Sequence, residues 1–387
     1  MPKVMLVKLS DLATTANEAV VITDAEVNSA VIDDGNSVKQ IQGALGLLVR
    51  GVTDVGGICC DKSGNTYISD QAQHVIVKVS ESGTVNVYAG IMGTSGRNGN
   101  KQRVPVSATI NGATWTGPSG NTGPALFNTP RGICCDNSGN IYVADTGNNQ
   151  IRKITPDGYV DCFAGNGDGV AGLVDSSMDA TQARFDSPAA VAVDNSGVIY
   201  VADTGNSAVR KVWGGKVMNI CGGVAGDNTN CRASNVTGVN AILTAPVGIC
   251  VDAKGNIFVT CRGAGSILPK IKKITPNGWV YLHSGSGTIG RSLGTATTST
   301  VPAEKAYTCE YGAWSYAGIC VDRYGYLFVV DNVATARTAP FTATRLLKVD
   351  PNGVPAEVAD FSGITSPTKV MGVAVSPAQK VFLTITA

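Results

Sequence analysis

One short phrase recurs six times along the chain, and its last copy is only half complete. Two copies are nearly identical: GICCDNSGNIYVADTGN begins at Gly132 and AVAVDNSGVIYVADTGN begins at Ala190. The shortest interval between copies, 318 to 372, is 54 residues and the longest, 57 to 132, is 75. A repeat of this length with strand and turn content predicts a β-propeller or a related repeat array. The copies start at Gly57, Gly132, Ala190, Gly248, Gly318 and Gly372.

Each copy predicts a unit of four short antiparallel strands. The second strand, IYVAD at 141–145, is rich in β-branched and aromatic residues, which favour strands. The turn Thr155-Pro156-Asp157-Gly158 favours a hairpin, because Pro fixes φ and Gly accepts positive φ. Four-stranded antiparallel units repeated radially are propeller blades. We predict blades one to five at residues 57–90, 132–165, 190–223, 248–285 and 318–363.

The sixth copy, at 371–387, supplies only two strands. Residues 6–11 match the third strand of blade one at 76–81, and residues 18–23 (EAVVIT) are expected as the fourth strand. We therefore predict that residues 1–23 complete blade six. The result is an all-β, six-bladed propeller that forms one domain of residues 1–387. Closing the ring in this way removes two open sheet edges.

Two phrases resemble the signature of a known family. VADTGN occurs at 143–148 and 201–206, followed by the third strands IRKI at 151–154 and VRKV at 209–212. These phrases resemble the NHL-repeat family of β-propellers, and the resemblance extends over nearly the whole chain. In the fourth copy Thr260 replaces the Asp that ends the second strand. The resemblance implies a propeller but leaves the activity open, because one fold hosts many functions.

Charge is low, and this limits the partners. The formal net charge is +1 and only 15% of the residues are charged. We therefore do not expect a nucleic-acid partner, although some NHL propellers bind RNA through basic surfaces. The basic pairs of the third strands are expected to form a solvated outer ladder. These pairs are Arg152-Lys153, Arg210-Lys211 and Lys272-Lys273.

The N-terminal residues carry no secretion signal, and no apolar run reaches the length of a membrane span. We expect synthesis in the cytoplasm and no membrane span. The eleven cysteines are scattered, and most occupy small core positions of the repeat, so structural thiols are favoured over reactive ones. Pairing of Cys221 with Cys231 stays open, because spacing alone does not establish it.

The loops predict two unequal faces. First-to-second and third-to-fourth connections are tight, whereas the insertions between 90 and 132 and between 285 and 318 are long. Long loops on a rigid scaffold often carry binding. The aromatic residues there either contact a ligand or pin their own loop. The candidate binding residues on this face are Tyr307, Tyr311, Trp314, Tyr316, Trp115 and His74.

Acidic residues end the second strands at equivalent positions, and two interpretations apply. A ring of carboxylates could bind a cation. The favoured alternative is that each side chain accepts hydrogen bonds from nearby turn amides, because the residue recurs with the repeat. The chain has only two histidines, so a His-rich zinc site is not expected, and no cofactor is predicted. The candidate metal ligands are Asp70, Asp145, Asp203 and Asp331.

These observations favour a non-enzymatic scaffold that contacts other proteins. Low charge and a surface rich in Ser, Thr, Asn and Gly are typical of large assemblies, such as a phage tail or capsid surface in a virion. Two alternatives stay open. One is a metal-dependent lactonase-like or hydrolase-like enzyme with a cation in its central channel. The other is a propeller that binds a glycan or a peptide on its own.

Overall fold

The computed structural model describes side chains and backbone over most of blades one to five, and the backbone of further strands named below. No α-helix occurs among these residues; two 3-10 helices, Thr146–Asn148 and Ala180–Gln182, are the helical elements. The fully described ranges are 52–82, 84–97, 125–223, 241, 243–261, 271–284, 318–331, 346–353, 372–377 and 381–384.

Blade two shows how the repeat builds its strands. Its strands are β12 (Pro130–Cys135), β13 (Ile141–Asp145), β14 (Gln150–Ile154) and β15 (Tyr159–Ala164), each antiparallel to the next. All five residues of β13 are buried, as expected for a strand inside a sheet that packs on both faces. In the first turn the Asp136 carboxylate accepts hydrogen bonds from the backbone of Ser138 and Asn140 at 2.8 and 2.9 Å.

Four further sheets repeat this order, so five blades are each built around four consecutive strands. The four consecutive strands of each of these sheets agree with the predicted blade to within two residues at either end. The strands inside blade five differ from the prediction. In blade five the second and third strands are longer than predicted, so Asp331 lies inside its strand and pairs with Arg345 rather than ending the strand.

The strands of these four sheets are, for blade one, β5 (Val55–Cys60), β6 (Thr66–Asp70), β7 (Val75–Val79) and β8 (Val85–Ala89); for blade three, β16 (Pro188–Val193), β17 (Ile199–Asp203), β18 (Ala208–Trp213) and β19 (Lys216–Gly222); for blade four, β21 (Pro246–Val251), β22 (Ile257–Cys261), β23 (Lys270–Ile274) and β24 (Trp279–Ser284); and for blade five, β25 (Ile319–Val321), β26 (Leu327–Ala334), β27 (Phe341–Val349) and β28 (Pro355–Gly363).

A further sheet joins the two ends of the chain. β29 (Lys369–Val375) and β30 (Val381–Thr386) pair with each other, and β1 (Val4–Leu9) pairs antiparallel with β30, as the sequence predicts. The predicted fourth strand is wrong. β4 (Ala44–Val49) pairs with β1 instead, whereas β2 (Val20–Thr23), within the predicted segment 18–23, pairs parallel with β28 of blade five.

The physical reason for this error is the length of the connection. In blade two, as in the other copies, a tight turn joins the third and fourth strands, and the prediction placed the fourth strand at 18–23, shortly after residues 6–11. The six-residue strand β4 is as long as β1, and all six residues of each pair. The shorter β2 has four residues and adds to the outside of blade five.

Four sheets carry a fifth strand at their outer edge, next to the outermost strand of the blade. The fifth strands are β9 (Gln102–Arg103) on β15, β20 (Val236–Thr237) on β24, β2 on β28 and β3 (Val38–Ile41) on β4. Two further short strands, β10 (Thr109–Ile110) and β11 (Ala113–Thr114), pair only with each other.

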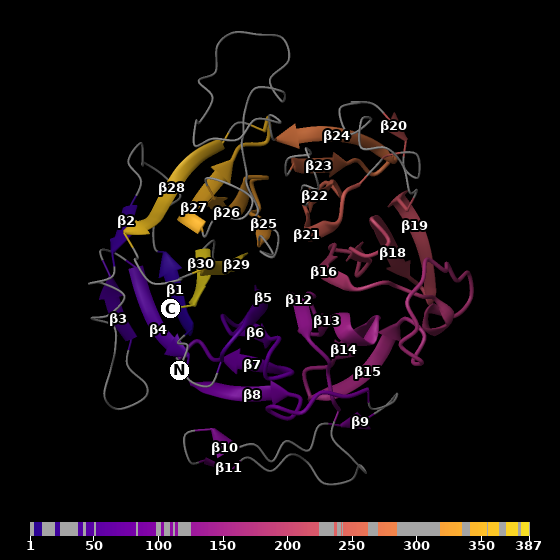
Figure 1. The fold of residues 1–387 in the computed structure, drawn as a ribbon, viewed down its shortest axis with the longest axis horizontal. Coiled ribbons are helices and arrows are strands. Elements are labelled where there is room, and N and C mark those ends of the chain that lie inside the picture. The colour runs from indigo at the N-terminus through magenta and orange to yellow at the C-terminus, as the bar shows by residue number, and fades with distance from the viewer. Residues whose placement is uncertain are drawn as a thin grey trace.

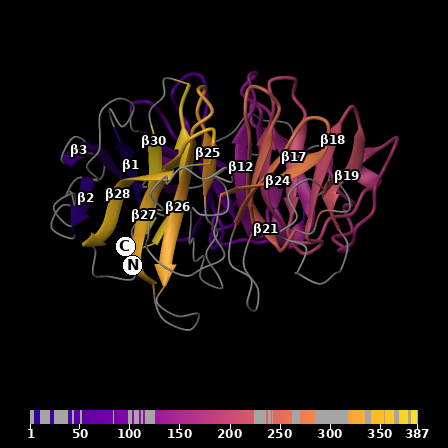
Figure 2. The ribbon, with the colours of Figure 1, turned by 90° about the horizontal axis from the view of Figure 1, so that it is seen from above.

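Figure 1 shows the sheets arranged around a common axis, with the first strand of each sheet innermost. Figure 2 shows the sheets edge-on, with many strands running roughly along this axis. The first and last strands, β1 and β30, lie side by side. The core lies between neighbouring sheets; one cluster joins Ile68 and Val77 of blade one to Ile141 and Val160 of blade two.

The innermost strands approach one another at a position occupied by glycine or alanine. A Cβ atom on Gly132 would overlap Ala190 Cα and lie 2.8 Å from Ala189 O in the next blade. A Cβ on Gly372 would lie 2.7 Å from Ile58 Cγ2 of blade one. Real Cβ atoms do not approach other heavy atoms this closely, so the small residue sets the distance between inner strands.

Replacing Gly132 by alanine therefore forces the inner strands of blades two and three apart. We expect Gly132→Ala to lower the free energy of unfolding by about 1–3 kcal/mol, as overpacking a close-packed core does. Gly167→Ala is the matched control, because a Cβ there meets nothing within 4 Å and Gly167 does not need a positive φ. Urea unfolding of both variants tests this; equal stability of the two variants would contradict it.

His283 gives the fold a pH dependence. The ring is buried on β24, edge-on to Phe258 with centroids 4.9 Å apart, and burial lowers the pKa of His283 from 6.5 to about 4. The unfolded chain binds this proton more readily, so its contribution to stability is complete above pH 6.5 and is lost as the pH falls toward 4.

We expect the wild type to lose about 3 kcal/mol more than His283→Phe between pH 7 and pH 4, the value of a pKa difference of this size. Urea unfolding at the two pH values measures both losses. The other titrating groups are common to both proteins and cancel in the comparison. If the two proteins lose the same stability, His283 does not titrate as the structure indicates.

Candidate functional site

The connections between second and third strands meet the connections that lead into each blade. We call the surface that they form the loop face; its described parts are residues 52–54, 71–74, 91–97, 125–129, 146–149, 166–172, 183–187, 204–207 and 243–245. Hydrogen bonds join the two kinds of loop, for example from Asn148 Nδ2 to Gly96 O at 2.8 Å and from Asn206 Nδ2 to Gly172 O at 2.7 Å. The predicted grouping of these connections on one face is therefore correct for the described loops.

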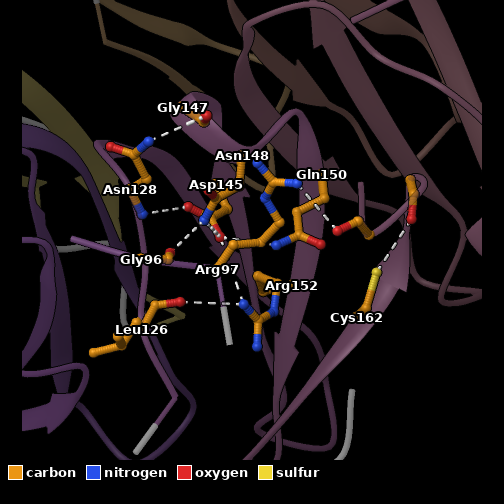
Figure 3. A network of polar contacts seen from close by, with 12 residues as sticks. Gly96, Arg97, Leu126, Asn128, Asp145, Gly147, Asn148, Gln150, Arg152 and Cys162 are labelled. Atoms are coloured by element: carbon orange, nitrogen blue, oxygen red, sulfur yellow. Dashed lines mark hydrogen bonds and ion pairs between the residues drawn. The ribbon is translucent and has the colours of Figure 1, made fainter. Parts of the chain in front are cut away.

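Asp145 occupies the centre of the polar network in blade two (Figure 3). Its carboxylate is fully buried and accepts hydrogen bonds from Asn128 N at 2.8 Å and from Asn148 Nδ2 at 2.8 Å. Arg152 Nη1 lies 3.6 Å from the same carboxylate. Burial raises the pKa of Asp145, and Arg152 and the hydrogen bonds oppose this rise. The carboxylate thus ties the loop that enters the blade to the turn that follows its second strand.

Blade three repeats this network with the same residue types. Asp203 accepts hydrogen bonds from Asp186 N at 2.8 Å, Asn206 Nδ2 at 2.8 Å and Arg210 Nη1 at 3.0 Å. Burial raises the pKa of Asp203 to about 6 against the effect of these donors. A feature present in two blades with the same partners indicates a structural role of the repeat.

The remaining letters of the signature join neighbouring blades. Thr146 Oγ1 donates to Pro188 O of blade three at 2.7 Å, and Thr204 Oγ1 donates to Pro246 O of blade four at 2.6 Å. At the glycine of the signature, a Cβ on Gly147 would lie 2.5 Å from Asn128 Cγ, so glycine allows the incoming loop to approach without moving that side chain. Each residue of the signature therefore has a bonding or packing task within the fold.

The prediction of a solvated basic ladder is wrong for the first residue of each pair. Arg152, Arg210 and Lys272 are buried, because the third strand points them toward the core of the blade. Arg210 lies over the Phe185 ring at 5.2 Å, and Arg152 lies over Phe127 at 5.5 Å. The second residues lie beside aromatic rings: Lys153 near Tyr142, Lys211 near Trp213 and Lys273 near Phe258.

Arg210 also anchors a segment that the sequence did not single out. Its Nη2 donates to Asp175 Oδ1 at 2.6 Å and to Val174 O at 2.9 Å. Asp175 Oδ1 in turn accepts from Asn219 N of the outermost strand at 2.9 Å. An acidic residue in a loop gives no distinctive signal, so only the structure identifies Asp175 as the partner of a buried arginine.

His74 connects blades one and two. It has a φ of 58°, and its Nδ1 accepts a hydrogen bond from Thr129 N at 3.0 Å. Asn149 occupies the same place in blade two, with a φ of 53°, and accepts from Ser187 N at 2.7 Å. The imidazole of this predicted binding residue is therefore engaged in a contact between blades.

The other predicted binding residues, Trp115, Tyr307, Tyr311, Trp314 and Tyr316, lie outside the described residues. So does Cys231, the possible partner of Cys221. Cys59, Cys134 and Cys320 lie in the core or partly buried beside it, and burial raises the pKa of each thiol well above its usual range. Neutral thiols are poor nucleophiles, which agrees with structural cysteines.

The acidic residues considered as metal ligands are held in separate blades. Asp70, like Asp145 and Asp203, accepts backbone hydrogen bonds, from Thr53 N at 2.6 Å and from Ala72 N at 3.0 Å. Asp331 is fully buried in blade five. Among the described residues, no three His, Cys, Asp or Glu side chains come together as a possible metal site.

A small cavity, open to solvent, lies on the axis between the inner strands. Glycine, alanine, valine and isoleucine line it, including Gly57, Gly132, Ala190, Gly248 and Ile319. These lining residues offer no side chain that could hold a cation or transfer a proton. The cavity thus gives no support to a metal-dependent active site on the axis.

Exposed apolar side chains recur along the segment 170–178 and on β19 of blade three. Seven large apolar residues are exposed in the described part of the chain, and five of them lie here. Met178 is the most exposed, at 89%, and Met218 on β19 is 43% exposed. The segment is attached to β19 through Ser176 and Val217, whose main chains exchange hydrogen bonds of 2.8 and 2.9 Å. We call Val170, Leu173, Val174, Met178 and Met218 the apolar patch.

No helix among the described residues is long and apolar enough to cross a membrane.

Comparison with solved structures supports the fold. A gluconolactonase from Xanthomonas campestris aligns with a TM-score of 0.50 over 87% of this chain and 86% of that one, at 14% identity. Identity this low carries no inference about activity. The likeness agrees with an all-β propeller of small antiparallel sheets.

Comparison of sequences finds relatives that match parts of the chain. Human Teneurin-1 is 28% identical over 186 residues, which cover 44% of this chain and 6% of that protein. The human E3 ubiquitin-protein ligase TRIM32 is 25% identical over 251 residues, 56% of this chain and 36% of that one. The chain thus spans only a small part of the Teneurin-1 length. These relatives give no support to the predicted virion role.

The family model for the Teneurin NHL domain matches residues 11–288, well over half of the 387 residues. The match includes both copies of the VADTGN signature and the loops that they join. The NHL-repeat resemblance is thereby confirmed, and this chain belongs to the Teneurin NHL domain family.

Proposed function

We propose that the chain is a six-bladed, closed propeller that serves as a rigid scaffold for binding other proteins. Two observations support closure: β1 pairs with β30, and Gly372 approaches Ile58 of blade one. Residues of all six inner strands line the axial cavity, as a ring would require. A closed ring would hold the outer surfaces of the blades in fixed positions.

The apolar patch carries the proposal of protein binding. Monomeric proteins rarely gather exposed apolar side chains in one place unless another molecule covers them. Methionine suits such a surface, because its flexible, polarizable side chain adapts to different partners. Asp145, Asp203 and His74 of the loop face are engaged in bonds within the fold, whereas the side chains of the patch are exposed.

The segment that carries the patch is preorganised. The buried Arg210 holds Asp175 and Val174, and Ser176 pairs with Val217. A surface that is already ordered loses less conformational entropy on binding than a free loop would. The proposed partner is therefore a protein with an apolar surface that covers Met178 and its neighbours. A place in a virion would be one form of such an assembly, suggested by composition alone.

Charge on the patch should abolish this binding. We expect the double variant Leu173→Lys, Met178→Lys to lower the recovery of the native partners at least about tenfold, since a binding hot spot is worth more than 1.4 kcal/mol. Both side chains are exposed, so the thermal stability should stay within about 0.5 kcal/mol of the wild type. Quantitative affinity purification from the native source, with the tagged chain as bait, measures the recovery.

Tyr324→Lys is the matched control, because Tyr324 is an exposed apolar residue (61%) in the first turn of blade five, far along the chain from the patch. A photo-crosslinking residue at position 178 identifies which recovered protein touches the patch. Equal recovery with the double variant and with Tyr324→Lys would refute binding through the patch.

A further inference from the structure

In several blades a short segment of the chain pairs with the outermost strand, at the same position along that strand. We call these the pairing segments. In blade two β9 pairs with Tyr159 and Val160, and Val160 lies opposite Ile154 of the third strand. In blade four β20 pairs with Trp279 and Val280, and Val280 lies opposite Ile274. Both fifth strands therefore join the outermost strand at its first residues.

In blade three a single residue, Ser176, makes the same contact with the outermost strand. Val217 lies opposite Val212 of the third strand and exchanges two main-chain hydrogen bonds with Ser176. In blades two, three and four the pairing segment comes from the connection that leads into that blade. Blade five also carries a fifth strand, β2, and so does the terminal sheet, β3.

Blade one differs from the others. The equivalent residue is Val85, which lies opposite Val79. The connection into this blade, between β4 and β5, is only residues 50–54. The Asp70 carboxylate holds Thr53 N at 2.6 Å and Asp54 N at 3.3 Å, so this connection is committed to the loop face. Among the strands that the structure describes, none pairs with the outer side of β8.

The register also determines which main-chain N–H groups of β8 point away from β7. Val217 and Asn219 of blade three use their N–H groups toward Ser176 O and Asp175 Oδ1. Asn219 lies opposite Arg210, and Val87 of blade one lies opposite Val77 at the matching position. Alternation along a strand then places the N–H groups of Val85 and Val87 on the open side of β8. Asn86 between them is exposed.

We propose that the outer edge of β8 binds an extended segment of a partner protein as an added antiparallel strand. Strand addition to an open sheet edge is a general mode of peptide recognition, with main-chain hydrogen bonds supplying the affinity. The chain's own pairing segments indicate the chemistry of the partner. They are polar or β-branched: Gln102-Arg103, Asp175-Ser176 and Val236-Thr237.

The partner segment should therefore carry a β-branched or polar residue opposite Val85, where the other blades have Val236, Ser176 and Gln102. It should also carry an acceptor such as Asp or Asn for the N–H of Val87, as Asp175 does for Asn219. This surface lies on blade one and the apolar patch on blade three, so either can fail without the other.

Amide hydrogen exchange of the full chain tests whether the edge is open. The matched pairs are Val85 against Val217 and Val87 against Asn219, because each pair shares one register position. We expect the amides of Val85 and Val87 to exchange at least about tenfold faster than their counterparts. Equal protection would mean that another part of the chain already covers the edge, and would overturn the proposal.

Selection from a displayed library of eight-residue peptides, rich in β-branched and polar residues, tests binding. We expect the enriched peptides to lose at least about tenfold in affinity for Val85→Pro, which removes the outward N–H, and to keep their affinity for Val85→Thr, which retains it. Proline is tolerated in an edge strand where its nitrogen faces solvent. Failure to enrich any peptide, or equal binding to both variants, would overturn the proposal. If Val85→Pro does not fold, the exchange measurement decides alone.

Discussion

The close approach of the innermost strands is the constraint on which the rest of the architecture depends. Gly132 leaves no room for a Cβ beside Ala190, and Gly372 leaves none beside Ile58. Because the sheets converge at these positions, each second strand is enclosed between neighbouring sheets, and every residue of β13 and of β17 is buried. A larger residue at the inner position would separate the sheets and open the core between them.

A second set of interactions keeps the blades in register at the loop face. Burying a carboxylate lowers the free energy of unfolding unless the carboxylate is paired or hydrogen-bonded. Here the carboxylates of Asp145 and Asp203 accept hydrogen bonds from a loop amide and an asparagine side chain, and each lies beside an arginine. The threonine after each carboxylate bonds to the next blade. Apolar contact near the axis and polar contact at the loop face thus act on the same pair of neighbouring blades, so a blade cannot rotate without breaking one of them.

Much of this could be predicted from the sequence, because repetition supplies the comparison that a single copy lacks. The blade boundaries and the pairing of β1 with β30 followed from matching copies. The partner of β1 on its other side did not, because the unique segment between β1 and β4 has no counterpart in other copies. The prediction that Arg152 and Arg210 face solvent was wrong. A charged side chain is expected at the surface unless a buried partner is known, and the sequence does not show that Asp145 and Asp203 are buried beside these arginines. The apolar patch left no signal, since its members are ordinary residues of a loop and one strand.

The repeated signature also separates what the fold needs from what a partner can use. Residues that recur in successive blades make the contacts between blades. The surfaces available for recognition are therefore those where one blade differs from the others. Blade three departs through an apolar segment held by Arg210 and Asp175. Blade one departs because its short incoming connection supplies no pairing segment for β8. In a propeller of this kind, a break in the internal symmetry is thus a physical criterion for a binding surface, because the contacts between blades do not require it.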